Sequence, residues 1–245
     1  MNLFRMLGIC TLLAGTFLLG ISRCAEQTPC PNDPSEFTET QHFLAPIRGI
    51  EVNQPVTVYL KSGIKQSVTI QAQSSSQKLL TPKVESGILR FPQQGCPSMG
   101  LVNVFVTLAE PIVSLVVAGE AEVYSEESLD VHDELKLHVL DHGELNLDLD
   151  AQQVESVLSG EGILNLIGQA EEHILTLLEN ATFNGYDFES KAYWAKLFGA
   201  GDAFIQLEGG TLEVEISDSG SVYYAGKPTQ IQQQITGSGK LIQAD

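Results

Sequence analysis

Basic residues are scarce in this sequence, and their scarcity excludes one large class of partner. Of the 245 residues, 13 are Lys or Arg and 31 are Asp or Glu, which gives a net charge of −18 at pH 7. A protein that binds nucleic acid needs a basic face to displace counterions from the phosphates. We therefore expect no nucleic-acid partner.

Long hydrophobic runs are missing except at the start of the chain. Later stretches fall short of the roughly 20 apolar residues that cross a bilayer as a helix, which excludes a multi-span transporter. The first run, Met6 to Ile21, follows a basic start and indicates a secretory signal peptide over residues 1–24. Arg23 argues against lipid anchoring through Cys24. We expect export to the periplasm, the outer surface or the medium, with no membrane span left after cleavage.

Cysteine is rare as well, with four in the whole chain. Cys10 and Cys24 belong to the signal segment, which leaves Cys30 and Cys96 in an oxidising compartment. We predict a disulfide between these two residues. It would tie the leader, residues 25–42, to the body of the domain.

The usual catalytic motifs are absent. There is no Gly-x-Ser-x-Gly elbow and no phosphate-binding loop. His138 and His142 lie close to Asp141, but on an extended chain a spacing of four residues separates the pair by more than about 12 Å. We predict no catalytic residue, no metal site and no cofactor, and therefore a protein that is not an enzyme.

The charge is distributed unevenly, and the distribution divides the chain. Residues 25–117 hold six basic and seven acidic residues, whereas residues 118–245 hold five basic and 24 acidic ones. Before the boundary, apolar residues alternate with polar ones from Ile50 to Leu108, which predicts a β-rich N-terminal part over residues 43–117.

After residue 118 a short turn with a small central residue recurs about every 19 residues. The centres are Ala121, Gly143, Gly162, Ala181, Gly201, Gly220 and Gly239. A period of this length is typical of a solenoid, in which each unit buries its apolar face only by stacking on its neighbours. We therefore predict an all-β, single-stranded β-solenoid with coils of about 19 residues over residues 118–245.

Residues at fixed distances from these centres predict which side chains point into the core and which point outward. The position four residues earlier is apolar in the last six repeats: Val139, Leu158, Leu177, Leu197, Ile216 and Ile235. The position two residues later is apolar too, and polar residues lie between, as expected of strands. Asn146, Asn165 and Asn184 follow three centres at the third residue and predict a stacked amide ladder. Glycine at a centre permits either positive φ or close backbone approach.

Three segments resemble the head GIN domain family of putative autotransporter adhesins. They are FLAPIRGIEVNQPVTVYL at Phe43 to Leu60, LSGEGILNL at Leu158 to Leu166, and SDSGSVYYAGKPTQIQQQITGSGKLIQ at Ser217 to Gln243. The resemblance covers roughly residues 43–243 and implies a secreted, right-handed β-solenoid that begins with a β-rich portion. It implies no enzymatic activity, and it suggests binding at the cell surface or in the periplasm.

Trp194 is the exposed aromatic residue that the repeat alignment singles out. It lies in a mostly polar column beside Ile174, where the pair could stack on a sugar or anchor a partner protein. The alternative is that Trp194 packs under the irregular segment from Gly185 to Lys191. The favoured function is an exported, non-enzymatic, adhesin-like protein that presents an acidic face to a glycan or to an envelope or surface protein.

Two other classes of function remain open. A polysaccharide lyase also uses a β-solenoid, and the seven acidic residues between Asp130 and Asp150 suggest weak Ca²⁺ binding. However, no arginine and only five lysines lie in the coils, and carboxylates on outward columns explain the charge. A periplasmic scaffold is the third class, and an open last coil, Gly237 to Asp245, predicts weak end-to-end dimers.

Overall fold

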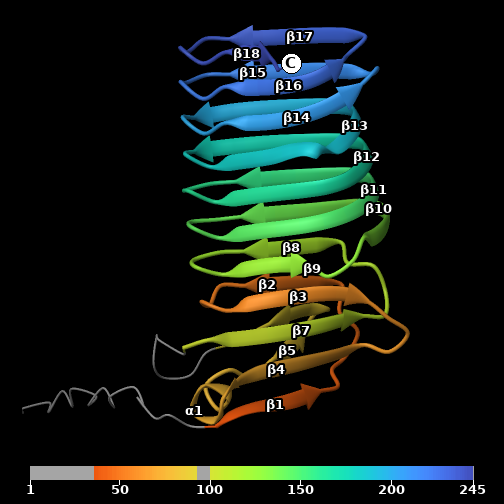
Figure 1. Ribbon diagram of the computed structural model, residues 1–245, viewed down its shortest axis with the longest axis vertical. Helices are drawn as coiled ribbons and strands as arrows, with labels where there is room; N and C mark the ends of the chain where they lie inside the picture. The colour runs from red at the N-terminus through yellow and green to blue at the C-terminus, as the bar shows by residue number, and fades with distance from the viewer. Residues whose placement is uncertain (1–35, 93–99, 245) are drawn as a thin grey trace, which may run out of the picture.

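The computed structural model describes residues 36–92 and 100–244, which form one stack of β-strands (Figure 1). In the lower part of the stack lie β1 (Phe37–His42), β2 (Gly49–Val52), β3 (Thr57–Ser62), β4 (Ser67–Gln73), helix α1 (Ser74–Gln77), β5 (Lys83–Glu85), β6 (Ile88–Arg90) and β7 (Val102–Leu108). Above them lie β8 (Ser114–Val117), β9 (Glu122–Ser125), β10 (Leu129–Val139), β11 (Glu144–Leu158), β12 (Ile163–Glu179), β13 (Thr182–Gly199), β14 (Ala203–Glu208), β15 (Thr211–Ile216), β16 (Val222–Lys227), β17 (Gln230–Ile235) and β18 (Leu241–Gln243).

The fold is a β-solenoid with coils of about 19 residues, as the sequence predicts. From β8 to β18 each strand pairs in parallel with the strand one coil away, and the register of β11 against β12 places Asn146 opposite Asn165. The stack has two outer sheets (Figure 1). The front sheet contains β7, β3, β9, the first parts of β11 to β13, β14, β16 and β18, and the rear sheet contains β6, β2, β8, the last parts of β10 to β13, β15 and β17.

The alternation of apolar and polar residues explains the core. Side chains of one strand point to opposite faces in turn, and in β11 every second residue is buried from Leu145 to Ala151 and again from Val154 to Leu158. The two predicted inward columns are buried from β10 up to β16, for example at Leu158 and Leu164. Ile235 in the last coil is 36% exposed because, among the described residues, no further coil lies above it.

The lower part of the stack does not follow the order of the chain. The coil of β2 and β3 lies between the coil of β6 and β7 and the coil of β8 and β9 (Figure 1). From β3 the chain descends through β4, which pairs antiparallel with β7 and with β1, and then climbs again. Parallel stacking is continuous across residue 118, because β8 and β9 belong to one coil.

The glycines at the turn centres permit close approach of neighbouring coils. A Cβ atom on Gly143 would lie 2.9 Å from the carbonyl oxygen of Val117 in the coil below, and one on Gly201 would overlap the carbonyl oxygen of Ala181. Positive φ occurs two residues earlier in three successive coils, at Asp141 (60°), Gly160 (71°) and Glu179 (58°). Close approach of the coils therefore occurs at the turn centre, whereas positive φ occurs two residues before it.

Several expectations concern segments outside the described residues or are left as predictions. The signal segment, Cys30 and Cys96 all lie outside the described ranges, so the disulfide stays a prediction. Within those ranges no helix has the length and apolar character to cross a membrane. Among the strands that the structure describes, β17 and β18 at the upper end each pair on one side only, and Ile231 is 41% exposed. Weak association through this end stays a prediction as well.

Candidate binding surface

One outward column of the front sheet carries aromatic and asparagine side chains along most of the stack. Cα pairing from coil to coil connects its members in this order, from the lower end to the upper: Phe105, Tyr59, Tyr124, Asn146, Asn165, Asn184, Phe204, Tyr223 and Ile242. We call this set the front column. It consists of a lower aromatic group, a central amide group and an upper aromatic group.

The aromatic rings of the front column stack on one another. In the lower group the centroid of Tyr59 lies 5.0 Å from that of Phe105 and 5.8 Å from that of Tyr124, with interplanar angles of 15° and 23°. In the upper group Phe204 and Tyr223 stack at 5.0 Å and 13°. Because the rings cover one another's faces, their edges and hydroxyl groups point toward solvent.

The three asparagines form a hydrogen-bonded ladder between the two aromatic groups. Asn184 Nδ2 donates to Asn165 Oδ1, and Asn165 Nδ2 donates to Asn146 Oδ1, both at 2.6 Å. At the foot of the ladder Asn146 Nδ2 donates to Glu144 Oε1 at 3.1 Å. These bonds fix the orientation of amides that are otherwise accessible, so the column presents polar groups at defined positions.

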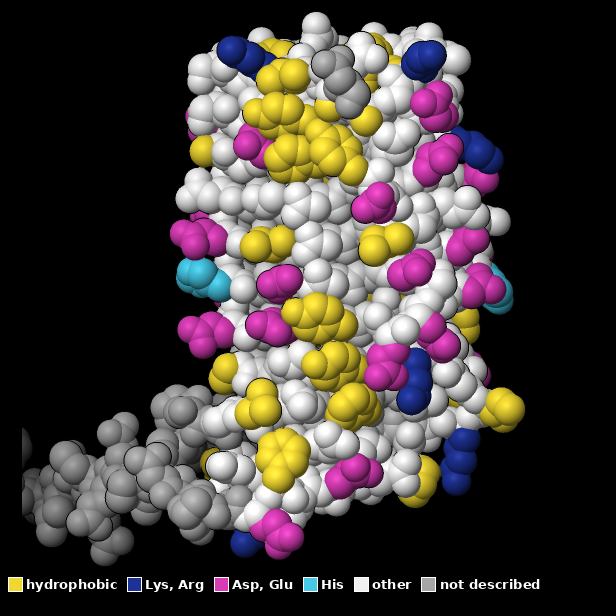
Figure 2. All heavy atoms as spheres, in the orientation of Figure 1, with side chains coloured by type: hydrophobic (Ala, Val, Ile, Leu, Met, Phe, Trp, Pro, Cys, Tyr) yellow, Lys and Arg dark blue, Asp and Glu magenta, His cyan; other side chains and the backbone are white. Residues whose placement is uncertain are grey.

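A bulge in β13 adds a further ring to the upper aromatic group. The pairing of β13 with β12 shifts between Asn165 and Ile167, which leaves Tyr186 as an extra residue on the outer face. The ring of Tyr186 is 42% exposed and meets that of Phe204 edge-on at 5.5 Å. Figure 2 shows the two groups of apolar side chains on this face, with carboxylates beside them.

Carboxylates flank the front column and affect its phenols. Glu122 and Glu144 lie in the neighbouring outward column, and the hydroxyl of Tyr124 donates to Glu122 Oε2 at 3.3 Å. Burial raises the pKa of Tyr124, and the charges of both glutamates raise it further. Burial also raises the pKa of Tyr186. Both phenols are therefore neutral hydrogen-bond donors at physiological pH.

Trp194 and Ile174 lie on the rear sheet and not near the front column. They are Cα partners in β13 and β12, so the structure brings the predicted pair together. Both side chains are half-buried. The next member of their column, above Trp194, is Glu213, and below Ile174 is Glu155. This surface is a single apolar pair between two carboxylates, and its role in binding stays a prediction.

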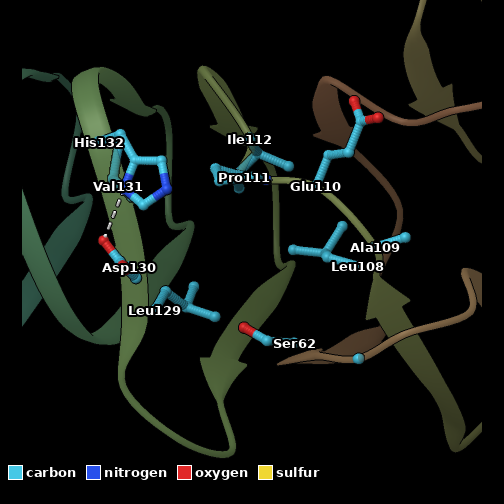
Figure 3. Close-up of a pocket in the computed structure, with 11 residues that line it drawn as sticks. Ser62, Leu108, Ala109, Glu110, Pro111, Ile112, Leu129, Asp130, Val131 and His132 are labelled. Atoms are coloured by element: carbon cyan, nitrogen blue, oxygen red, sulfur yellow. Dashed lines mark ion pairs between the residues drawn. The ribbon is translucent and has the colours of Figure 1, made fainter.

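Several hollows lie on the described part of the chain, and two of them lie near the acidic stretch between Asp130 and Asp150. The first has a volume of about 190 Å³ and lies where the connection from Leu108 to Ile112 passes the start of β10 (Figure 3). At its edge His132 Nδ1 lies 3.1 Å from Asp130 Oδ1. The other, of about 500 Å³, lies at the bend of the coils and is lined by Asp133, Glu134, Gln152, Gln153, Glu171 and Glu172. Within residues 36–92 and 100–244 no three His, Cys, Asp or Glu side chains are grouped to hold a metal ion. Weak Ca²⁺ binding therefore stays a prediction.

A serine and a histidine meet inside the core. Ser156 Oγ lies 2.9 Å from His173 Nε2, and both side chains are fully buried. The ring of His173 packs against those of Phe183, Phe188 and Tyr193. Burial lowers the pKa of His173 to about 3, so the imidazole is neutral at physiological pH. No substrate can reach this pair, and its role is structural.

The three asparagines belong to a longer series of residues at the same offset from the turn centres. The third residue after each of the seven turn centres is Tyr124, Asn146, Asn165, Asn184, Phe204, Tyr223 and Ile242. The aromatic members were therefore visible at the same offset. The lower members, Tyr59 and Phe105, had no such signal because they precede the repeat and because their coils are stacked out of chain order.

The fold and this surface define a class of protein: a parallel β-solenoid that displays a fixed column of side chains along one outer sheet. Within that class the chain belongs to the head GIN domain family, described as putative auto-transporter adhesins, whose pattern matches residues 47–228. A search of curated proteins finds no match.

Solved structures of similar fold include proteins from Bacteroides and Parabacteroides species. A putative adhesin from Bacteroides fragilis is 17% identical, with a TM-score of 0.75 over 85% of this chain and 97% of that one. Putative adhesins from Parabacteroides distasonis and Parabacteroides merdae are 17% and 15% identical, with TM-scores of 0.69 and 0.68 over 86% of this chain and 98% of each. At these identities the likeness establishes the fold alone.

Proposed function

We propose that this protein is an exported, non-enzymatic binding protein of the cell envelope or surface, and that its front column is the contact surface. The observation that carries the proposal is the column itself, in which two aromatic groups and an amide ladder occupy one line on the outside of a rigid stack. Core packing does not require aromatic rings on an outer face. Exposed aromatic groups on an otherwise charged surface commonly mark interaction sites.

The family and the sequence features support this class of function. Relatives of the same fold are named as putative adhesins. The N-terminal segment has the pattern of an export signal, and the buried position of the Ser156–His173 pair gives no support to a catalytic role. The carbohydrate-active enzyme and the periplasmic scaffold are the alternatives. The scaffold predicts a different location in the cell, which the next experiment measures.

Location is the first property to measure, because it limits the partners that the protein can meet. We expect a protease added to intact cells to digest the protein as completely as it does after the outer membrane is permeabilised. Protection until permeabilisation would confine the protein to the periplasm and favour the scaffold. Retention in the cytoplasm would contradict export and with it the proposed function.

The front column can be tested against the rear surface in one binding assay. The assay measures how much purified protein sediments with cell-envelope fragments of the cells that produce it. We expect the double variant Tyr186→Ser and Tyr223→Thr to bind at least about tenfold more weakly, since it removes two rings from the upper aromatic group. Lys196→Thr, an exposed change on the rear sheet, is the matched control and should bind like the unchanged protein.

The variant Trp194→Ala separates the two candidate surfaces. We expect it to retain binding and fold. If Trp194→Ala abolishes sedimentation while the front double variant keeps it, the contact surface is the rear pair of Trp194 and Ile174. If the unchanged protein does not sediment with the fragments at all, the proposed binding function is wrong.

A further inference from the structure

The chemistry of the front column limits the ligands it can take. Its accessible groups are ring edges, phenol hydroxyls and carboxamides, and it includes no charged side chain. Each carboxamide has two N–H donors and two acceptor lone pairs. The ladder uses one donor and one acceptor of Asn165, which leaves one of each for a ligand. Such a mixture of neutral donors, acceptors and apolar edges is suited to a ligand that carries many hydroxyl groups.

The spacing of these groups is regular and set by the coils. Successive members of the column stand one inter-strand distance apart, about 4.8 Å. That distance is close to the advance of one sugar along an extended linear polysaccharide, so such a chain lying along the column would present about one sugar to each coil. The upper and lower aromatic groups would offer ring edges and phenol hydroxyls to sugars beyond either end of the ladder.

The neighbouring charges select against an anionic chain. Glu122 and Glu144 stand on one side of the column, and Asp148 and Asp187 stand in the outward column on the other side. Carboxylates accept hydrogen bonds from sugar hydroxyls, but they repel uronic acids, sulfates and phosphates. Glu122 and Glu144 already accept hydrogen bonds from Tyr124 and Asn146, which holds them at the edge of the column.

We propose that the front column binds a neutral, linear glycan that lies along the axis of the solenoid and bonds to the amide ladder through its hydroxyl groups. This inference rests on the proposed function and names the class of ligand. A protein partner would use the same aromatic groups but would not require the unused donor and acceptor of Asn165.

The test uses the full exported protein and the same envelope fragments, treated in two ways before the assay. Periodate cleaves vicinal diols of sugars, whereas proteinase K removes exposed protein. We expect binding to survive the protease and to fall at least about tenfold after periodate. We also expect less than a twofold change in binding between about 0.05 M and about 0.5 M NaCl, because a neutral ligand offers no charge for salt to screen.

The variant Asn165→Thr tests whether the asparagine ladder contributes to this binding. Threonine suits an outward strand position but cannot continue the chain of amides. We expect the variant to keep its circular dichroism spectrum and to bind at least about fivefold more weakly, whereas Lys196→Thr binds normally.

Three results would overturn the glycan inference. Loss of binding after proteinase K, with no effect of periodate, would identify a protein ligand and leave the proposed function intact. A strong salt dependence would exclude a neutral ligand. Full binding by Asn165→Thr would show that the ladder does not contact the glycan. Absence of binding to untreated fragments is a separate result, which contradicts the proposed function itself.

Discussion

Replacing Gly201 by alanine should destabilise the solenoid by about 3 kcal/mol or more. The new Cβ atom would overlap the carbonyl oxygen of Ala181, which belongs to the backbone of the next coil. A backbone atom cannot rotate away as a side chain can, so the two coils must separate at this corner. The N–H groups of Ala200 and Gly201 both donate to the carbonyl of Glu179, and separation would weaken these bonds. Guanidinium unfolding followed by circular dichroism would measure the loss.

Other glycines provide a graded series of controls. Gly143→Ala should have a smaller effect, since its Cβ would lie 2.9 Å from the Val117 oxygen and a shift of a few tenths of an ångström relieves the contact. Gly209→Ala meets no atom within 4 Å but has a φ of 71°, so it should show only the conformational penalty of about 1 kcal/mol. A loss for Gly201→Ala no larger than that for Gly209→Ala would contradict the idea that close approach of the coils requires glycine at Gly201.

The repeat was predictable from the sequence because the solenoid imposes a strict rule on it. Every coil must place an apolar residue at the same point of the cross-section, so Val139, Leu158 and Leu177 recur at equal intervals. The same rule made the contact between Asn146 and Asn165 a prediction that needed no coordinates. In a stacked fold, equal spacing in sequence becomes direct contact in space.

The order of the lowest coils could not be predicted in this way. The strands of the N-terminal part have the expected alternation, and β3 and β7 lie within the predicted β-rich region. Which strand lies above which depends on pairing between segments far apart in the chain. Tyr59 stacks on Phe105 and on Tyr124, which both lie dozens of residues later in the chain, and no local pattern encodes these contacts.

The position of His173 also shows what the pattern omits. It occupies an inward column beside Val154 and Tyr193, so burial could be inferred. Its hydrogen bond to Ser156 depends on a second inward column and on ring orientations that a sequence alignment does not contain. This buried imidazole leads to a second large effect, on the dependence of stability on pH.

Acid should destabilise the protein through His173 by about 3 kcal/mol at pH 4. The pKa of His173 is lowered from 6.5 to about 3 in the folded protein because burial disfavours the charged imidazolium. The unfolded chain therefore takes up the proton first. The contribution of the neutral imidazole to stability is complete above pH 6.5 and is lost as the pH falls toward 3, by about 5 kcal/mol in total.

The groups that face His173 offer the imidazolium no compensating charge. Its ring contacts the Ser156 hydroxyl from β11 and the rings of Phe183, Phe188 and Tyr193 from β13. Burial raises the pKa of Tyr193, so this phenol stays neutral, and its hydroxyl donates to the carbonyl of Phe188 at 3.1 Å. Protonation of His173 would therefore place an unpaired charge in the core.

The double variant Ser156→Ala and His173→Leu should remove this part of the pH dependence. It deletes both members of the hydrogen bond, so no polar group is left without its partner, and leucine continues an inward column that is mostly apolar. Comparing the two proteins at each pH cancels the effect of the many surface carboxylates, which titrate in both. We expect the unfolding free energy of the double variant to gain about 3 kcal/mol on that of the unchanged protein between pH 7 and pH 4. Lys196→Thr, an exposed change on the rear sheet, is the control and should give a pH profile parallel to that of the unchanged protein. Parallel profiles for the double variant and the unchanged protein would show that His173 is not the acid-sensitive group of the core.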